Sequence, residues 1–110
     1  MYISRKELIY KIMTKENLNF GTALEAAKQG KKIARQGWNG KGMWVAYGEG
    51  NKSLEADKFW NPHTKQFAID NGGTAEVLPY LLFKTADNKI LMGWLASQTD
   101  MLANDWCILD

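Results

Sequence analysis

Hydrophobic and polar positions along this 110-residue chain show two periodicities: the spacing of a helix near the start and the alternation of strands later. The first helical segment, residues 5–14, follows a capping box formed by Ser4 and Glu7 and carries its apolar residues on one face. A short polar link then separates this segment from the rest. We therefore interpret residues 1–17 as an N-terminal helical extension, which packs either on its own core or on a partner subunit.

A second helix is predicted to begin directly after Asn19, because a short polar side chain at this position caps a helix well. Gly30 marks its end, since the residue that follows a helix favours a positive φ angle. Between these two signals, apolar residues recur at the spacing of one helix face: Phe20, Ala23, Leu24 and Ala27.

Short apolar runs bounded by turn-forming residues predict strands in the remainder of the chain. Residues 31–35 and 43–47 form one pair, and residues 80–85 and 89–94 form a hairpin around a polar turn. A last strand is expected at 105–109. The predicted fold class is therefore α+β: a single small domain in which N-terminal helices pack on a mostly antiparallel sheet.

Residues 48–78 show neither a helical nor a strand-like periodicity. Ser53 is expected to cap a single turn that Pro62 ends, and Asn71 with the two glycines that follow it predicts a bend. We interpret this stretch as an irregular insert within a ligand-binding domain, residues 18–110. Long irregular segments in compact domains often form a lid or an interface.

The loop at residues 37–42 places Trp38 between glycines, with Arg35 and Lys41 close to it in sequence. Glycines let backbone amides approach a ligand, and an indole offers a flat face to a base or a cation. The loop lacks the spacing of a dinucleotide-binding or P-loop motif. Two interpretations stay open: a ligand-binding loop, which we favour, and a hairpin turn with the indole folded over the core.

Residues 94–106 combine two tryptophans with two carboxylates and several small polar side chains. Ser97 is a suitable N-cap for a helical turn at 98–103, and Asp100 stands where a carboxylate can reach back to the cap. The stretch is either a capped turn that joins two strands or a polar binding surface beside indole rings.

The composition limits the chemistry. His63 and Cys107 are the single histidine and cysteine, and structural zinc sites use several such ligands, so we expect neither a metal nor a cofactor. Cys107 is interpreted as a small core hydrophobe, and His63 as a solvated loop residue. No apolar run approaches the ~20 residues of a membrane span, and the N-terminus lacks a signal peptide's apolar core. A cytoplasmic protein without a membrane partner is expected.

The net charge of +2 is unevenly distributed. Residues 1–42 contain nine Lys and Arg against three Glu, whereas residues 43–110 contain five Lys against nine acidic residues. This asymmetry suits a phosphate-bearing ligand, and it equally suits attraction between neighbouring subunits. It falls short of the strongly basic character of most DNA-binding domains, so nucleic acid is not the expected partner.

Several blocks of this sequence occur together in one known family: residues 19–24, 30–43, 79–80, 83–86 and 94–106. In this order and at this chain length, they resemble the small phage proteins called Thoeris anti-defence proteins of the second type. The resemblance covers about residues 18–47 and 79–109.

The resemblance implies a non-enzymatic sponge that works in the cytoplasm of the infected bacterial host and blocks activation of the Thoeris effector. Members of the family assemble as homotetramers and sequester cyclic nucleotide signals of bacterial immunity, chiefly a glycocyclic form of ADP-ribose. Some also take up cyclic oligonucleotides. The resemblance implies no catalytic residues and a ligand-binding set of Arg35, Trp38, Asn39, Ser97, Gln98, Thr99, Asp100 and Asn104.

The chemistry of these residues is compatible with such a ligand. A pyrophosphate needs a guanidinium fork, which Arg35 supplies, and an adenine ring needs an aromatic face, which Trp38 supplies. The helix start at Ser97 offers free amides. Asp100 would repel phosphate, so we expect it on ribose hydroxyls or in the helix cap.

Two other classes of function stay open as alternatives. A nucleotide hydrolase could use His63, Asp100 or Asp105, although the sequence does not pair them at a catalytic spacing. A single-stranded nucleic-acid binding module could use the tryptophans and lysines, and its binding would then weaken steeply with salt.

Overall fold

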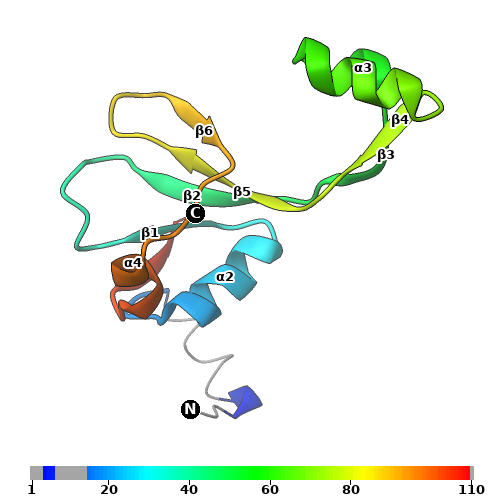
Figure 1. Cartoon of the computed structure of the whole chain (residues 1–110). Coiled ribbons are helices and arrows are strands. Elements are labelled where there is room, and N and C mark those ends of the chain that lie inside the picture. The colour runs from blue at the N-terminus through cyan, green and yellow to red at the C-terminus, as the bar shows by residue number, and fades with distance from the viewer. Residues whose placement is uncertain (1–3, 7–14, 110) are drawn as a thin grey trace. The chain divides into compact units, whose positions relative to one another are not determined.

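The computed structural model describes residues 4–6 and 15–109 (Figure 1). The predicted first helix, residues 5–14, lies largely outside the described residues. From residue 15 onwards the elements are α2 (Phe20–Lys28), β1 (Lys32–Arg35), β2 (Trp44–Gly48), β3 (Asn51–Glu55), the 3₁₀ helix η1 (Ala56–Lys58), α3 (Pro62–Asp70), β4 (Thr74–Val77), β5 (Tyr80–Lys84), β6 (Ile90–Met92), α4 (Gln98–Leu102) and β7 (Trp106–Leu109).

The chain forms two compact units. We call the described parts of Met1–Tyr47 and Leu81–Asp110 the main unit, and Gly48–Tyr80 the inserted unit. A five-stranded sheet has the order β6-β5-β2-β1-β7, and a two-stranded sheet pairs β3 with β4. The pairs β1–β2, β1–β7, β5–β6 and β3–β4 are antiparallel, so the predicted α+β fold with a mostly antiparallel arrangement of strands is confirmed.

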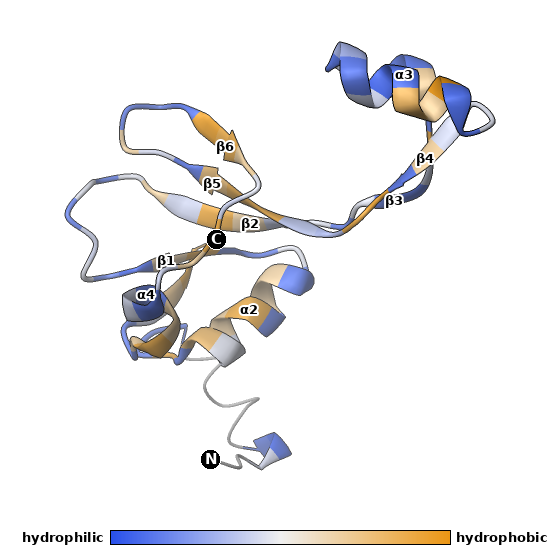
Figure 2. Ribbon diagram, in the orientation of Figure 1, coloured by the Kyte–Doolittle hydropathy of each residue, from blue (hydrophilic) through white to orange (hydrophobic). Residues whose placement is uncertain are grey.

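The helix α2 begins and ends where the sequence predicts. The side chain of Asn19 accepts a hydrogen bond from the Thr22 amide at 2.8 Å, and Gly30 follows the helix with φ +97°. In Figure 2 the ribbon of α2 changes between hydrophobic and hydrophilic colours along its length, as in an amphipathic helix. The small side chains Ala23, Ala26 and Ala27 are buried.

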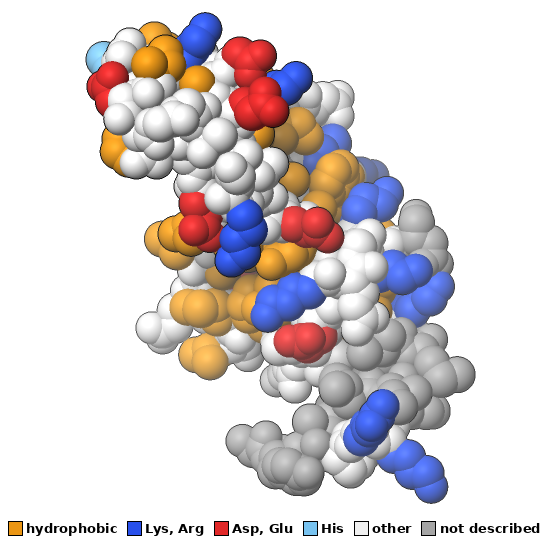
Figure 3. All heavy atoms as spheres, turned by 90° about the vertical axis from the view of Figure 1, so that its right-hand side faces the viewer, with side chains coloured by type: hydrophobic (Ala, Val, Ile, Leu, Met, Phe, Trp, Pro, Cys, Tyr) orange, Lys and Arg blue, Asp and Glu red, His pale blue; other side chains and the backbone are white. Residues whose placement is uncertain are grey.

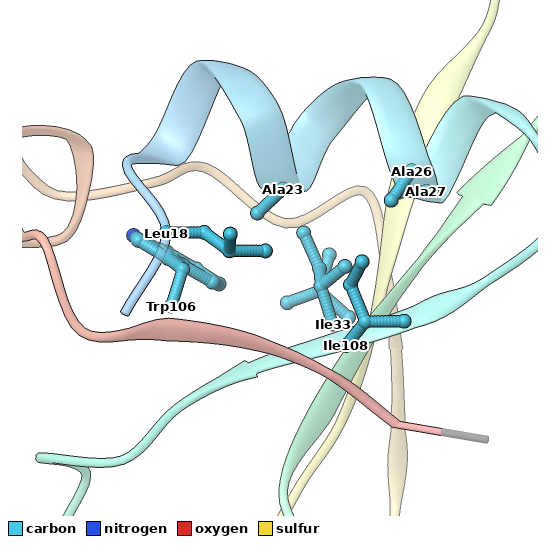
Figure 4. Packing of buried hydrophobic residues seen from close by; sticks show 8 residues of the cluster. Leu18, Ala23, Ala26, Ala27, Ile33, Trp106 and Ile108 are labelled. Atoms are coloured by element: carbon cyan, nitrogen blue, oxygen red, sulfur yellow. The ribbon is translucent and has the colours of Figure 1, made fainter. Parts of the chain in front are cut away.

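Small residues on α2 allow a close approach to larger ones on the sheet. Figure 4 shows the three alanines of α2 turned toward Leu18, Ile33, Trp106 and Ile108. The register of β1 against β7 explains part of this cluster, because it places Ile33 opposite Ile108. Trp106, Leu18 and Ile33 are fully buried, and they form the centre of the main unit's core.

The hairpins of the main unit agree with the predictions. β5 and β6 pair around a turn in which Asn88 has φ +65°, a conformation that asparagine tolerates. The last part of the chain also agrees: Ser97 caps the short helix α4, and β7 follows it. The expected capped turn between two strands is therefore present.

The inserted unit differs from the prediction, because residues 48–78 are not irregular. They form β3, η1, α3 and β4. Pro62, expected to end a turn, instead occupies the first turn of α3, where its missing amide costs nothing and its fixed φ suits a helix. Asn61 caps this helix and accepts hydrogen bonds from the amides of His63 and Thr64.

The inserted unit buries little apolar surface. Its buried hydrophobic residues are Ala68 and Ala75, whereas Trp60 is 90% and Phe67 62% exposed. At the top of Figure 3, hydrophobic side chains reach the surface there among charged ones. Local backbone geometry helps to define this unit: Gly50 has φ +74°, and a Cβ atom at this position would clash with the carbonyl oxygen of Val77.

Candidate functional site

A cluster of charged and aromatic side chains lies where β1, the loop after it, α4 and the start of β7 meet in the main unit. Arg35, the last residue of β1, is held by two carboxylates. Its Nε donates to Asp105 Oδ1 at 2.8 Å, and its Nη1 donates to Asp100 Oδ1 at 2.8 Å. The side chains of Arg35 and Asp100 are each 16% exposed, so solvent screens this ion pair only partly.

Trp38 belongs to the same cluster. Its indole Nε1 donates to Asp100 Oδ1 at 3.1 Å. Its ring makes edge contacts with Phe83, Trp94 and Trp106, at centroid distances of 5.5, 6.2 and 5.4 Å. The indole therefore packs over the core, as one of the two interpretations of the loop expected, while the residue stays partly exposed.

Asp100 joins the helix cap to this cluster. Its amide donates to the Ser97 hydroxyl at 3.1 Å, which confirms Ser97 as the N-cap of α4. Its backbone carbonyl accepts from Trp106 Nε1 at 2.8 Å. Burial raises the pKa of the Asp100 carboxyl, but hydrogen bonds from Arg35, Trp38 and Ser97 outweigh it, and the pKa lies below its usual value.

Asp105 is the member of the cluster that the predicted ligand set lacks. Besides Arg35, it accepts a hydrogen bond from the Gly37 amide at 2.8 Å, and so fixes the start of the 37–42 loop. The hydrogen bond from Arg35 is the main reason that the pKa of Asp105 is lowered, and bonds to both carboxylates raise the pKa of Arg35. The pairing of Arg35 opposite Trp106 brings Asp105 next to the guanidinium.

No short-range signal in the sequence connects Arg35 with Asp105, which lie seventy residues apart. The connection follows from the antiparallel pairing of β1 with β7. The amide of Gln36, just after β1, donates to the carbonyl of Asp105, just before β7, and this brings Asp105 beside the end of β1, where Arg35 lies. A prediction of strand pairing, rather than of motifs, would have been needed to find it.

The other predicted site residues form an exposed polar group at the edges of this cluster. Asn39 follows Trp38 in the loop, Gln98 and Thr99 lie in the first turn of α4, and Asn104 precedes Asp105. In the described part of the chain, hydrogen bonds connect Arg35, Trp38, Ser97 and Asp100. Within that part, no such bond joins the side chains of Asn39, Gln98, Thr99 or Asn104 to them. Their amide and hydroxyl groups face solvent and can accept or donate hydrogen bonds.

The arrangement has clear chemical consequences. A guanidinium has five N–H groups, and only part of them are engaged by Asp100 and Asp105. The N–H groups that remain can donate to a further neutral acceptor, but one guanidinium and two carboxylates leave the cluster with a net negative charge, which disfavours the phosphate contact that the sequence predicted for Arg35. Both carboxylates are ionised at neutral pH, since the usual carboxyl pKa of 3.8 already lies far below 7 and the pKa values here are lower still, so neither can serve as a general acid there.

The single cysteine of the chain lies in the main unit and the single histidine in the inserted unit. Cys107 was predicted to be a core residue, but it is only partly buried, because it alternates in β7 with the buried Trp106 and Ile108 and so lies on the other face of the strand. Its Sγ donates to the Ala34 carbonyl at 3.3 Å, and burial raises the pKa of the thiol, which lowers its reactivity. His63 is exposed, in α3 rather than in the expected loop.

Within 4–6 and 15–109, no three His, Cys, Asp or Glu side chains gather so that they could hold a metal ion. Across the same residues, no helix has both the length and the apolar character that a membrane span requires.

Comparison with known proteins gives two matches. Residues 18–109 match the model of the Tad2-like family, described as the Thoeris anti-defense 2-like domain. The chain is also 40% identical over 96 residues to a protein named Thoeris anti-defense 2 from Bacillus phage SP01, an alignment that covers 86% of this chain and 98% of the relative. The family match includes the inserted unit and leaves residues 1–17 outside.

Proposed function

The chain belongs to the Thoeris anti-defense 2-like family, and we propose that it is a phage sponge that binds a cyclic nucleotide immune signal in the infected bacterium without cleaving it. The family assignment supports the anti-defence role against the Thoeris system. The ligand we propose is of the glycocyclic ADP-ribose type. The single observation that carries the proposal is the match over residues 18–109, which contains every residue of the candidate site.

The cluster around Arg35 supports a binding role in a specific way. The ion pairs hold the guanidinium in a fixed position, so little conformational entropy is lost when one of its remaining N–H groups donates to a ribose or base acceptor of the ligand. Asn39, Gln98, Thr99 and Asn104 then supply exposed hydrogen-bonding groups for the base and ribose. We assign Asp100 to holding Arg35 and Trp38, not to the ligand itself.

A ligand of this size can bind tightly enough for a protein that acts as a sponge. About 35 non-hydrogen atoms at roughly −0.3 kcal/mol each give about −10 kcal/mol, which corresponds to a Kd of tens of nanomolar. A protein that acts by depletion needs this affinity and a number of binding sites comparable to the amount of signal.

We further propose that the protein is a homo-oligomer, with a tetramer as the expected state. Large apolar side chains are exposed in both units, more than a small monomer usually leaves uncovered. In the main unit they are Ile90, Leu91, Met92, Leu95, Met101 and Leu102. Association of copies would remove part of this surface from water.

Calorimetry with glycocyclic ADP-ribose, followed by recovery of the ligand from heat-denatured protein, tests the proposal. We expect tight binding and return of unaltered nucleotide in about one-to-one proportion with binding sites. Recovery of linear ADP-ribose that grows with incubation time would instead show an enzyme. Absence of binding to this ligand and to a panel of cyclic oligonucleotides would reject the sponge.

A variant at Trp38 locates the ligand. Because the indole packs against three aromatic rings, Trp38→Ala would disturb the core, so Trp38→Phe is the better choice. It removes the indole N–H that reaches Asp100 and reduces the aromatic face. We expect at least about tenfold weaker binding, equivalent to ~1.4 kcal/mol. Trp44→Phe, in β2, is the matched control and should bind like the parent.

A further inference from the structure

The strand β6 is an open edge of the main sheet. It stands last in the strand order and pairs on one side with β5, with Phe83 opposite Leu91. At the other end of the sheet, β7 receives additional bonds: Leu18 bridges to Trp106, and the amide of Ile108 donates to the Lys15 carbonyl. Among the described residues, no such segment lies along β6. A strand edge left open in this way can pair with another strand.

The hydrogen bonds along the β5–β6 hairpin show which backbone groups point outward. Gly93 donates to the Leu81 carbonyl, and Thr85 donates to the Lys89 carbonyl. Because bonded and non-bonded pairs alternate in an antiparallel ladder, Leu91 is also bonded toward β5. The amide and carbonyl groups of Ile90 and Met92 therefore point away from the sheet.

The side chains of this edge are apolar and exposed. Ile90, Leu91 and Met92 are 57, 49 and 54% exposed, although each is a large hydrophobic residue. Residues 90–99 contain no charged side chain. A soluble monomer usually protects such an edge with charges, proline or a bulge, and here the bulge comes only after the strand, where Gly93 and Trp94 both donate to Leu81.

We propose that β6 pairs antiparallel with β6 of a second copy of this chain, about a twofold axis that passes beside Leu91. In this register Ile90 exchanges both backbone hydrogen bonds with Met92 of the partner subunit, and Leu91 lies directly opposite the partner subunit's Leu91. The two five-stranded sheets then form one continuous sheet. The proposal rests on the oligomeric state proposed above and gives it a contact surface.

A second copy fits this edge because the edge is complementary to itself. A twofold contact requires that the same patch meet itself, and the outward groups of Ile90 and Met92 lie symmetrically about Leu91. Charge does not oppose the contact: Lys89 comes opposite an uncharged glycine of the other copy, and it already forms an ion pair with Asp87 at 3.2 Å. A strand with charged side chains would lack apolar partners for Leu91 and Ile90.

Charge variants at Leu91 test this register. Leu91→Lys and Leu91→Glu each place like charges opposite each other at the twofold axis, so each alone should weaken association about tenfold or more. An equimolar mixture of the two should associate again, because opposite charges then meet. Mass from light scattering across the micromolar range is the readout. Ala86→Lys, which adds the same charge in the turn of this hairpin, should keep the parent's mass.

Folding is checked separately by circular dichroism, and Met92→Pro gives a second test. Proline there removes an outward amide while leaving the bonds toward β5, so it should also lower the mass. The register is overturned if Leu91→Lys keeps the parent's mass, or if the Lys and Glu variants fail to associate when mixed. A monomeric parent that binds nucleotide would overturn this inference alone, whereas an oligomer joined through β6 that binds no nucleotide would overturn the sponge alone.

Discussion

The two units of this chain are stabilised in different ways. The main unit has a continuous hydrophobic core around Trp106, assembled from residues at both ends of the sequence. The inserted unit buries only alanines among its hydrophobic residues, and it exposes Trp60 and Phe67. Long-range packing therefore stabilises the first, whereas local caps, a two-stranded sheet and turn geometry define the second. The candidate site around Arg35, whose function depends on fixed geometry, therefore lies in the main unit, where the hydrophobic core holds its strands in place.

The largest expected effect is on the core of the main unit. Trp106→Ala removes ring contacts with Phe20 at 5.1 Å and Trp38 at 5.4 Å, together with the hydrogen bond to the Asp100 carbonyl. We expect a loss of about 3–5 kcal/mol in the free energy of unfolding. Urea denaturation followed by circular dichroism measures it. A loss below about 1 kcal/mol would mean that this tryptophan is not the centre of the core.

The next effect concerns the ion pairs of the candidate site. Arg35→Met keeps the length of the side chain but leaves Asp100 and Asp105 without their counter-ion. We expect a loss of about 2 kcal/mol, less than for a fully buried pair because the two carboxylates are partly exposed. Lys28→Met is the control: it breaks an exposed pair with Glu25 and should change stability by less than about 0.5 kcal/mol. Equal losses in the two variants would contradict a special role for the Arg35 cluster.

Acid should weaken the same cluster. The pKa values of Asp100 and Asp105 in the folded protein are lower than their usual value of 3.8, so the unfolded chain takes up protons first as the pH falls. The stabilisation is thus complete well above pH 3.8 and is lost as the pH falls below that value. Denaturation at several pH values should show this decline, and Asp105→Asn should flatten it. A parent and variant with identical acid dependence would contradict the prediction.

The features that could be predicted from the sequence are those that depend on local interactions, and the features that could not depend on distant ones. The caps at Asn19 and Ser97 were predictable, because each signal lies within a few residues of the helix that it starts. The prediction for Pro62 was wrong because proline occurs both after the end of a helix and in its first turn. Asn61, which caps α3, shows that the second case applies here. The bonds of Arg35 to Asp105 depend on a strand pairing between distant segments, which spacing along the chain does not encode.

A smaller effect is expected where the inserted unit depends on a cap. Asn61→Ala removes the acceptor of two amide hydrogen bonds at the start of α3. A lost cap typically costs about 1 kcal/mol, and here it should loosen α3 more than the main unit. Amide hydrogen exchange resolves the two units, and we expect faster exchange in residues 63–70 with unchanged protection in α2. Equal acceleration in both helices would mean that the units unfold together.

The smallest effect on folding should come from the tryptophan that the inserted unit exposes. Trp60 is 90% exposed, so its side chain contributes little burial to this chain on its own, whereas Trp106 is completely buried. Trp60→Ala should therefore change the free energy of unfolding by no more than about 0.5 kcal/mol, as exposed substitutions usually do. Measuring this variant beside Trp106→Ala compares the two units with the same chemical change. If Trp60→Ala destabilised the protein by several kcal/mol at concentrations where it is oligomeric, but not when dilute, the indole would be buried against another copy, and the contrast between the units would hold only for the separated chain.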